Sequence, residues 1–360
     1  MIRLFTTLLL LTLTAGTCLA ANDLGRSGPF RLIGGDRCGA DFLAQRNGAC
    51  DPPPVDTTGL SVAAATAARI ERARRLLGFV RVEAALHELD AAILAEPAAV
   101  DALHLRARLL LSQFNFAAAR RDLDQAIKAD PAHAAVRSTS AYLHLQVRQM
   151  PEALRDIELA MATAPDDPDA RWVRALILIA AGQRDTAEQD LDVALRDEGN
   201  WRARLSRAEI YLRQERFEAA ASETDVLLAA RPQNFESLHA RVLANVGARR
   251  FDLALADLSS MIGPPGGPYL LPPNHPNFGR LTFQRAMILA SAGRRDEALK
   301  DVEYVLGAGG LRAILRLQIF LRHNGLPDVA LDGQRSHQLE EAVLACFGQA
   351  ACGRGLAQKL

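Results

Sequence analysis

The chain has 360 residues, of which 49% are hydrophobic but only 5% aromatic, and its 42 basic and 42 acidic residues leave no formal net charge at pH 7. This balance argues against a nucleic-acid-binding protein, because such proteins gain most of their affinity from basic contacts to phosphates. The apolar residues are mostly Ala and Leu, so we expect closely packed helices, few strands, and either a large core or an elongated stack.

Residues 1–20 have the pattern of a secretory signal peptide. Arg3 precedes an uncharged apolar run that starts at Leu4, and small residues at Cys18 and Ala20 precede a polar segment. The run is shorter than the about 20 residues that span a bilayer, so a permanent transmembrane helix is the weaker interpretation. Lipid modification of Cys18 is a third possibility, although Ala-Gly-Thr before it does not match a Leu-led lipidation motif. We expect the mature protein to be secreted, most simply into a bacterial periplasm.

Residues 21–62 lack a helical period and contain many Gly and Pro residues, which predicts an irregular N-terminal segment. Removal of the signal would leave four cysteines, an even number that favours disulfides in an oxidising compartment. Of the three possible connectivities, Cys38–Cys50 with Cys346–Cys352 is favoured because short loops lose the least entropy on closure. Four free thiols are expected only without export, and the spacings lack the close Cys pairs of a zinc site.

Between residues 63 and 310 the sequence repeats one unit about seven times. Small residues recur at intervals of 34, 34, 34, 33, 34 and 44 residues, at Ala85, Ala119, Ala153, Ala187, Ala220, Ala254 and Ala298. Twelve residues before each of them lies a second column, made of Ala73, Ala107, Ala141, Ala175, Ala208, Val242 and Ala286. Twelve residues after each lies a residue that ends helices, at Pro97, Pro131, Pro165, Gly199, Pro232, Gly266 and Gly310. Apolar residues between these marks follow the helical period, so each unit predicts a hairpin of two closely packed helices.

Two charged columns accompany the small residues. One lies immediately before the small residue of each first helix, at Arg72, Arg106, Arg174, Arg207, Arg241 and Arg285, and only Ser140 interrupts it. The other lies three residues after the small residue of each second helix, at Glu88, Asp122, Asp156, Asp190, Glu223, Asp257 and Asp301. A charged strip for a ligand is one interpretation. Ion pairs that tie each hairpin together are the simpler one, because the opposite charges keep a fixed offset.

With this period, these small-residue columns and the terminal prolines, residues 66–310 resemble the tetratricopeptide repeat family. The large aromatic that the family places early in its first helix is mostly replaced here by Leu or Arg, and only Trp172 comes near it. The resemblance implies an all-α fold, in which about seven hairpins stack into a right-handed superhelical solenoid with a concave face. It also implies a non-catalytic scaffold that binds proteins or peptides.

In the family, the first helix of each unit lines the concave groove. The strip at the matching positions is apolar with scattered aromatics, which suits an amphipathic helix or an extended apolar peptide. Packing against the neighbouring unit is the alternative for each of these residues. The Lys, Asn and Arg set that clamps a terminal carboxylate in some relatives is absent, so clamp binding is not expected. The predicted partner-binding residues are His104, Arg108, Tyr142, Leu145, Trp172, Leu176, Glu209, Leu212, His239, Leu243, Phe283 and Met287.

The 44-residue interval contains a Pro/Gly-rich insertion at residues 263–280, which predicts a loop without helix. Its apolar side chains either contact a partner, with Tyr269 as the candidate, or fold back on the stack. Residues 311–360 predict two helical segments outside the repeat register, which cap the end of the stack and carry the second cysteine pair.

The sequence contains no recognisable catalytic set. Its eight histidines lack the i, i+4 spacing of a helical zinc pair, and neither a phosphate-binding glycine loop nor a Gly-x-Ser-x-Gly turn is present. We expect no enzyme, no cofactor and no metal, but a scaffold that binds a protein or peptide of the bacterial cell envelope. The alternatives are a permanent structural subunit or assembly factor of an envelope complex, and a hydrolase whose site lies in the insertion or the C-terminal segment.

Overall fold

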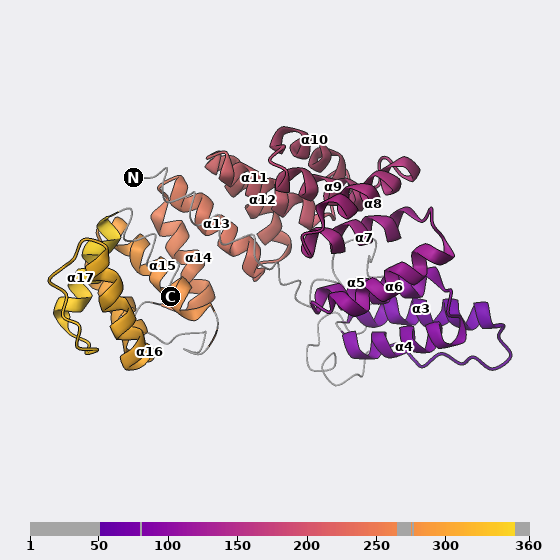
Figure 1. Ribbon diagram of the computed structural model, residues 1–360, viewed down its shortest axis with the longest axis horizontal. Coiled ribbons are helices and arrows are strands. Elements are labelled where there is room, and N and C mark those ends of the chain that lie inside the picture. Colours follow the sequence, from indigo (N-terminus) through magenta and orange to yellow (C-terminus); the bar gives the residue numbers. More distant parts are fainter. Residues whose placement is uncertain (1–50, 80, 265–274, 276, 350–360) are drawn as a thin grey trace. The chain divides into compact units, whose positions relative to one another are not determined.

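The computed structural model describes residues 51–79, 81–264, 275 and 277–349. In these residues the chain forms helices and no strand, as the composition predicts (Figure 1). The helices are α3 (Val62–Gly78), α4 (Val82–Ala95), α5 (Val100–Ser112), α6 (Phe116–Ala129), α7 (Ala134–Gln146), α8 (Met150–Thr163), α9 (Pro168–Ala180), α10 (Arg184–Ala194), α11 (Trp201–Arg213), α12 (Phe217–Ala230), α13 (Phe235–Gly247), α14 (Phe251–Ile262), α15 (Phe278–Ser291), α16 (Arg295–His323) and α17 (His337–Gly348).

The described chain divides into two compact units, one formed by residues 51–206 and the other by residues 207–349. In the first unit, α3 pairs with α4, α5 with α6, α7 with α8, and α9 with α10. The first helices of successive hairpins also contact one another, from α3 to α5, α7 and α9. In the second unit, α13 pairs with α14 and α15 with α16, while α17 packs on both α15 and α16.

Both predicted columns of small residues lie at helix contacts. All fourteen positions, from Ala73 and Ala85 to Ala286 and Ala298, have 0% of their surface exposed. Small side chains there let the two helices of a hairpin approach closely, which confirms the predicted repeat. In the first unit, apolar clusters follow one another from Ile70 to Ile177, and in the second unit one cluster extends from Leu228 to Phe347.

Proline ends the second helices where the sequence predicts it. The helices α4, α6, α8 and α12 each end two residues before a proline, because the residue before proline disfavours the helical conformation. Gly310 has φ 64° and ψ 178° inside α16 and divides this helix at a kink. Side-chain caps begin other helices: Asp167 accepts a bond of 2.7 Å from the N–H of Ala170, and Asn234 one of 2.8 Å from Ser237.

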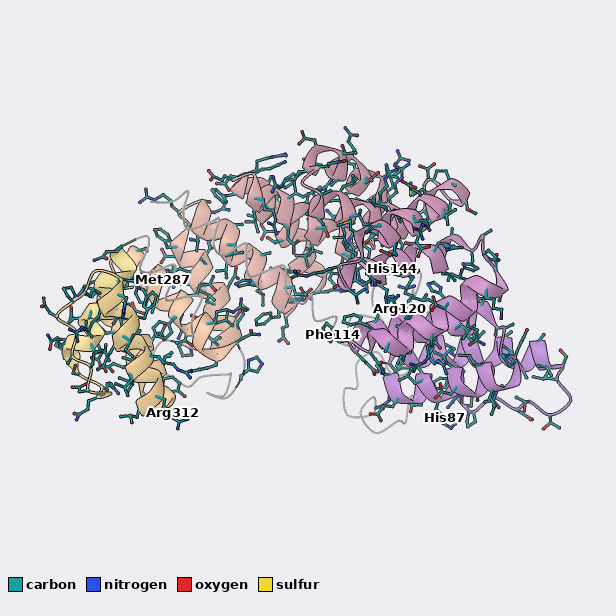
Figure 2. The ribbon with its side chains drawn as sticks, viewed as in Figure 1. His87, Phe114, Arg120, His144, Met287 and Arg312 are labelled. Atoms are coloured by element: carbon teal, nitrogen blue, oxygen red, sulfur yellow. The ribbon has the colours of Figure 1, made fainter. Side chains whose placement is uncertain are left out.

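The turn between the two helices of a hairpin uses one left-handed residue. Five residues before the small residue of the second helix, φ lies between 58° and 82° at Phe114, Arg148, Gly182, Glu215, Arg249 and Gly293. Four of these are not glycine, and a side chain in this conformation costs about 1 kcal/mol. Phe114 is 44% exposed at its turn (Figure 2).

The predicted insertion ends earlier than expected. The helix α15 begins at Phe278, so the last three residues of the segment 263–280 are helical. Phe278 is only 2% exposed, and its ring lies 5.4 Å from that of Tyr304, so it belongs to the core and not to a loop. The remaining apolar residues of the insertion, including Tyr269, lie outside the described residues.

The predicted signal and the cysteines Cys18, Cys38, Cys50 and Cys352 also lie outside the described residues. Cys346 is buried in α17 and is disulfide-bonded, with its partner outside the described part of the chain. Its pairing with Cys352 therefore stays a prediction.

Within the described residues, no single helix combines the length and apolar character needed to cross a membrane. One bent pair, Arg295–Gly307 with Gly310–His323, meets the criteria only when its two parts are taken together across an angle of 119°.

Candidate partner-binding site

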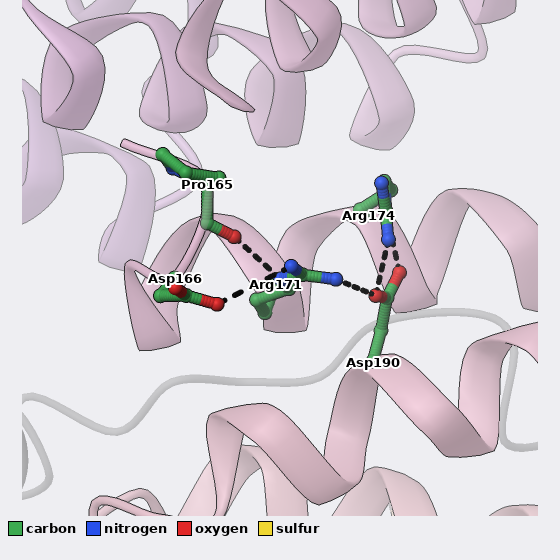
Figure 3. A network of polar contacts seen from close by, with 5 residues as sticks. All are labelled: Pro165, Asp166, Arg171, Arg174 and Asp190. Carbon is green, nitrogen blue, oxygen red and sulfur yellow. Dashed lines mark hydrogen bonds and ion pairs between the residues drawn. The ribbon is translucent and has the colours of Figure 1, made fainter. Parts of the chain in front are cut away.

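The charged columns form an ion pair within every hairpin that has a column arginine. In the α9–α10 hairpin, Arg174 donates from Nε to Asp190 at 2.5 Å, and Arg171 donates to the same carboxylate at 2.8 Å (Figure 3). The other column pairs have their closest contacts between 2.5 and 2.7 Å: Arg72–Glu88, Arg106–Asp122, Arg207–Glu223, Arg241–Asp257 and Arg285–Asp301. The arginine column is thus engaged in holding hairpins together, as the simpler interpretation predicts.

The hairpin that lacks a column arginine is completed by another residue. Ser140 donates to Asp156 at 2.6 Å, and Arg137 donates to the same carboxylate at 2.8 Å. Arg137 and Arg171 each lie three residues before the column position, and so does Arg69, which contacts Glu88 at 3.2 Å. This second set of arginines was not predicted from the sequence, although the repeat period contains it.

The pairs differ in burial. Asp122 and Asp257 are buried, while their guanidinium partners are about one quarter exposed. The hydrogen bonds that Arg106 and Arg241 donate to these carboxylates raise the pKa of each arginine. Arg285 and Asp301 are both fully buried, and Arg285 also donates to the carbonyl of Gly263.

An aromatic ledge lies on the first helices of the residues 51–206 unit. We use this name for Tyr142, Trp172, Trp201 and Arg202, which come from α7, α9 and the start of α11. The rings of Tyr142 and Trp172 are 5.4 Å apart and inclined by 32°. The guanidinium of Arg202 lies 5.6 Å from the Trp172 ring and 5.0 Å from the Trp201 ring. Since Trp172 Nε1 donates to Ser206 Oγ at 3.1 Å, the indole is held both at its edge and by its neighbours.

A histidine lies on the same set of helices. His104 Nε2 is 2.8 Å from Thr139 Oγ1, and this hydroxyl donates to the carbonyl of Ala135 at 2.9 Å, so the ring N–H donates to Thr139. Burial, assisted by the positive charges of Arg108, His133 and Arg74, lowers the pKa of His104 to about 3. His104 is therefore neutral near pH 7.

Neighbouring hairpins of this unit are also joined by polar contacts. Arg120 of α6 donates to the side chain of Gln149 at 2.8 Å, and His144 Nδ1 of α7 lies 2.9 Å from the same oxygen (Figure 2). Arg106 of α5 adds a contact of 2.6 Å to Asp90 of α4. These contacts join α6 to the α7–α8 hairpin and α5 to α4.

The structure separates the twelve described residues of the predicted groove into two groups. In the first unit they are half-buried on the first helices: His104, Arg108, Tyr142, Leu145, Trp172 and Leu176. In the second unit five are buried, namely Leu212, His239, Leu243, Phe283 and Met287, and only Glu209 is half-buried.

The buried group requires a correction of the expected surface. Phe283 is 1% exposed and packs edge to face against Phe347 of α17, with 6.1 Å between ring centres. Met287, labelled in Figure 2, belongs to the same core cluster. All nine residues from 281 to 289 in α15 are buried, so this helix is covered on every side. The partner-binding role of the half-buried group stays a prediction.

Two titratable groups of the second unit are shifted by burial. Burial raises the pKa of Glu209 to about 7, against the opposing charge of Arg213. Burial lowers the pKa of His239 to about 4, assisted by the charge of Arg280 and opposed by a hydrogen bond of 3.3 Å to Gln284. Among the described residues, no three His, Cys, Asp or Glu side chains gather as they would to hold a metal ion.

Trp201, Arg202 and Ser206 were not predicted from the sequence. The repeat period does not mark Ser206, because Trp172 lies three residues before Ala175 and the matching position before Ala208 is Leu205.

Comparisons with known proteins agree with this architecture. Two family models, both described as tetratricopeptide repeat, match residues 110–177 and 173–235. Residues 110–235 therefore match tetratricopeptide repeats, as the sequence indicates. No protein of curated function matches it.

The chain is also similar to several solved structures. A tetratricopeptide repeat protein from Parabacteroides merdae is 17% identical, with 79% of this chain and 99% of that chain covered and a TM-score of 0.43. PilF of Pseudomonas aeruginosa is also 17% identical, with 56% and 91% covered and a TM-score of 0.45. A chain of the APC/C Cut9–Hcn1 hetero-tetramer is 12% identical, with 60% and 41% covered and a TM-score of 0.51.

Proposed function

We propose that this protein is a non-catalytic scaffold that holds a segment of another protein against the first helices α5, α7 and α9. The observation that carries this proposal is the aromatic ledge. Tyr142, Trp172 and Arg202 are half-buried, so each side chain is fixed by packing while part of its surface faces outward. Trp, Tyr and Arg are the residues that most often dominate the energy of protein interfaces.

The ledge is already ordered before a partner arrives. Trp172 is held by its hydrogen bond to Ser206 and by its contacts with Tyr142 and Arg202. A partner that covers it therefore pays little conformational entropy for ordering these side chains, which favours binding.

The proposed surface belongs to the unit of residues 51–206. The equivalent surface of α15 is covered by α17 of the same chain, whose Phe347 packs against Phe283. We therefore place the partner on α5, α7 and α9 and not on the last hairpin.

We further propose that the scaffold acts in the cell envelope after export, which the signal-like residues 1–20 and the even number of remaining cysteines support. Alkylation of the unreduced protein followed by intact-mass measurement tests this. No modified cysteine is expected, whereas modification at all four mature cysteines would contradict export to an oxidising compartment.

A quantitative pull-down from envelope extract tests the binding surface. The double variant Tyr142→Ala, Trp172→Ala should lose the proteins that the unchanged chain captures. The matched control is Leu154→Ala, Leu159→Ala, which removes two exposed apolar side chains from the second helix α8. Circular dichroism must show the same helical signal in both variants. Equal capture by the ledge variant and the control would refute this surface.

A further inference from the structure

The second half of α16 carries arginine without any acidic residue. After the kink at Gly310 its sequence is LRAILRLQIFLRH, which contains no Asp or Glu. Arg312, which is labelled in Figure 2, is exposed, and so are Arg316 and Arg322. None of these three side chains makes an ion pair or a hydrogen bond to another described residue. Unlike the column arginines, they do not tie helices together.

Exposed aliphatic side chains lie beside these arginines. Leu311 is 61% exposed and Ile319 is 46% exposed. Arg312, Arg316 and Ile319 are spaced i, i+4 and i+7, so they share one face of the helix, and Leu311 lies at its border. We call this surface the basic strip, which consists of Leu311, Arg312, Arg316, Ile319 and Arg322.

The basic strip is held in place from behind. The opposite face of the same helix belongs to the apolar core of the unit of residues 207–349, through Ile314, Leu317, Phe320 and Leu321. The strip is therefore the outer face of a packed helix, and its arginines project from a fixed backbone.

The loop after α16 extends the aliphatic part of the basic strip. A Cβ at Gly333 would lie 2.6 Å from Leu311 Cδ1 and 3.0 Å from Leu315 Cγ, so the loop lies against these side chains. Leu331, two residues before this glycine, is 47% exposed. Aliphatic and cationic groups are thus exposed side by side at this end of the second unit.

The acidic residues of this loop do not neutralise the basic strip. Asp332 accepts a bond of 2.7 Å from Gln318 and one of 2.9 Å from the N–H of Gln334. Asp328 is exposed. Residues 310–335 contain four arginines against these two aspartates, so an excess of positive charge remains.

The acidic residues of the adjoining helices have other partners. Asp296 lies in the first turn of α16, on the far side of the kink. The others form ion pairs that do not involve the basic strip: Glu297 with Arg294, Asp301 with Arg285, Glu303 and Glu340 with Arg335, and Glu341 with Arg295.

We infer that the basic strip docks on the surface of a membrane that contains anionic lipids, with the three guanidinium groups at the lipid phosphates and Leu311 and Ile319 at the level of the headgroups. Unpaired positive charge fits an anionic partner, and arginine binds phosphate oxygens through two parallel hydrogen bonds. The aliphatic side chains favour lipid over a nucleic acid or a soluble acidic protein, because a lipid surface offers phosphates and an apolar layer next to each other. The inference goes beyond the proposed scaffold and does not depend on the aromatic ledge.

Flotation of the full-length protein with lipid vesicles tests the inference. The vesicles contain phosphatidylglycerol and phosphatidylcholine in equal parts, or phosphatidylcholine alone. The protein should bind the anionic vesicles at least about tenfold more tightly, and this preference should shrink as salt rises. Each arginine near an anionic surface contributes about fivefold, so Arg312→Glu, Arg316→Glu, Arg322→Glu should weaken binding to the anionic vesicles at least about a hundredfold.

A matched charge reversal serves as the control. Arg121→Glu, Arg155→Glu, Arg184→Glu changes three exposed arginines on the second helices α6, α8 and α10 and should bind like the unchanged chain. The apolar run at the N-terminus is the same in all variants, so any binding that it adds is common to them. Circular dichroism must show the same helical signal in each variant.

A second pair of variants tests the aliphatic contact. Leu311→Asn, Ile319→Asn keeps the charge and should weaken binding to the anionic vesicles at least about fivefold, because two exposed side chains no longer enter the headgroup layer. The control Leu154→Asn, Leu159→Asn changes two exposed leucines of α8 and should have no effect.

Several results would overturn the inference. One is equal binding of the two vesicle types, and another is equal binding of the arginine variant and its charge control to the anionic vesicles. Equal binding of the aliphatic variant and its control would show that no apolar layer is contacted. If the anionic vesicles do not bind but polyglutamate or a dT12 oligonucleotide binds through the three arginines, the partner is a soluble polyanion and not a membrane.

Discussion

The hairpins α7–α8 and α15–α16 share one repeat pattern but use their first helices differently. On α7 the buried residues follow the helical period, and Tyr142 and Leu145 stay half-buried. On α15 every residue from 281 to 289 is buried, because α17 packs on this helix from outside the repeats. The same column positions thus form surface in one region and core in the other, depending on what the rest of the chain places against them.

The largest expected effect concerns the ion pair Arg285–Asp301, which is fully buried in the unit of residues 207–349. Arg285→Met removes the guanidinium that Asp301 contacts in the core and should lower the free energy of unfolding by about 3–5 kcal/mol. Arg106→Met, in the unit of residues 51–206, should cost only about 1 kcal/mol, because the Arg106 side chain is about one quarter exposed and water can reach Asp122 where the guanidinium was. Urea denaturation followed by far-UV circular dichroism measures both. Equal losses in the two variants would contradict the difference in burial.

Tryptophan fluorescence reports on the unit of residues 51–206. Trp172 and Trp201 are the only tryptophans of the chain, and both lie in residues 51–206. Their emission should therefore report directly the loss of stability that Arg106→Met causes in this unit. The double variant Arg285→Met, Asp301→Leu should recover part of the stability that the single variant loses, since it leaves no charge in the core.

Protonation of His239 at acid pH should destabilise the unit of residues 207–349. Its pKa is about 4 in the folded protein against 6.5 ordinarily, so the folded state binds fewer protons than the unfolded one between these values. The contribution of neutral His239 to the free energy of unfolding is fully present above pH 6.5. It is lost as the pH falls from 6.5 to about 4, and the total loss is about 2–3 kcal/mol. His239→Gln should remove this part of the pH dependence in urea denaturation at pH 7 and pH 4. His87→Gln, at an exposed site on α4, is the control and should leave the pH dependence unchanged.

Close packing in the second unit can be probed at Gly247. A Cβ at this position would lie 2.3 Å from the ring of Phe217, so Gly247→Ala should cost about 1–2 kcal/mol through overpacking. The double variant Gly247→Ala, Phe217→Leu should regain part of the loss in the same denaturation experiment. An unchanged midpoint in the single variant would show that the ring moves aside freely.

The smallest expected effect concerns the turns within hairpins of the unit of residues 51–206. Arg148 has φ 61° and Gly182 has φ 82° at equivalent turns of neighbouring hairpins. Arg148→Gly should raise stability by about 0.5–1 kcal/mol, and Gly182→Ala should lower it by a similar amount, although no atom lies within 4 Å of the added methyl group. Tryptophan emission during urea denaturation reports both changes. Opposite signs from those expected would mean that side-chain contacts outweigh backbone strain.

The helical hairpins and their ion pairs could be predicted from the sequence because both depend on local spacing. Ala119 and Asp122 lie on one helix, and Arg106 lies a fixed distance before them, so the period alone brings them together. Proline ended helices where predicted for the same reason.

The exposure of the groove positions could not be predicted in this way. Phe283 and Met287 match Tyr142 and the other half-buried residues in spacing, but their burial depends on a helix more than fifty residues further along the chain. Nothing in the repeat period specifies where an out-of-register helix such as α17 docks. The contacts of Arg202 with the indole rings of Trp172 and Trp201 likewise depend on side-chain geometry that the spacing does not contain.

The spacing of the ion pairs also bears on how the protein could change over evolution. Each column arginine and its carboxylate are 16 positions apart, well inside one repeat, so a tandem duplication of one unit copies both partners together. Gain or loss of a unit near 34 codons would then change the length of the array without passing through an intermediate that holds an unmatched charge.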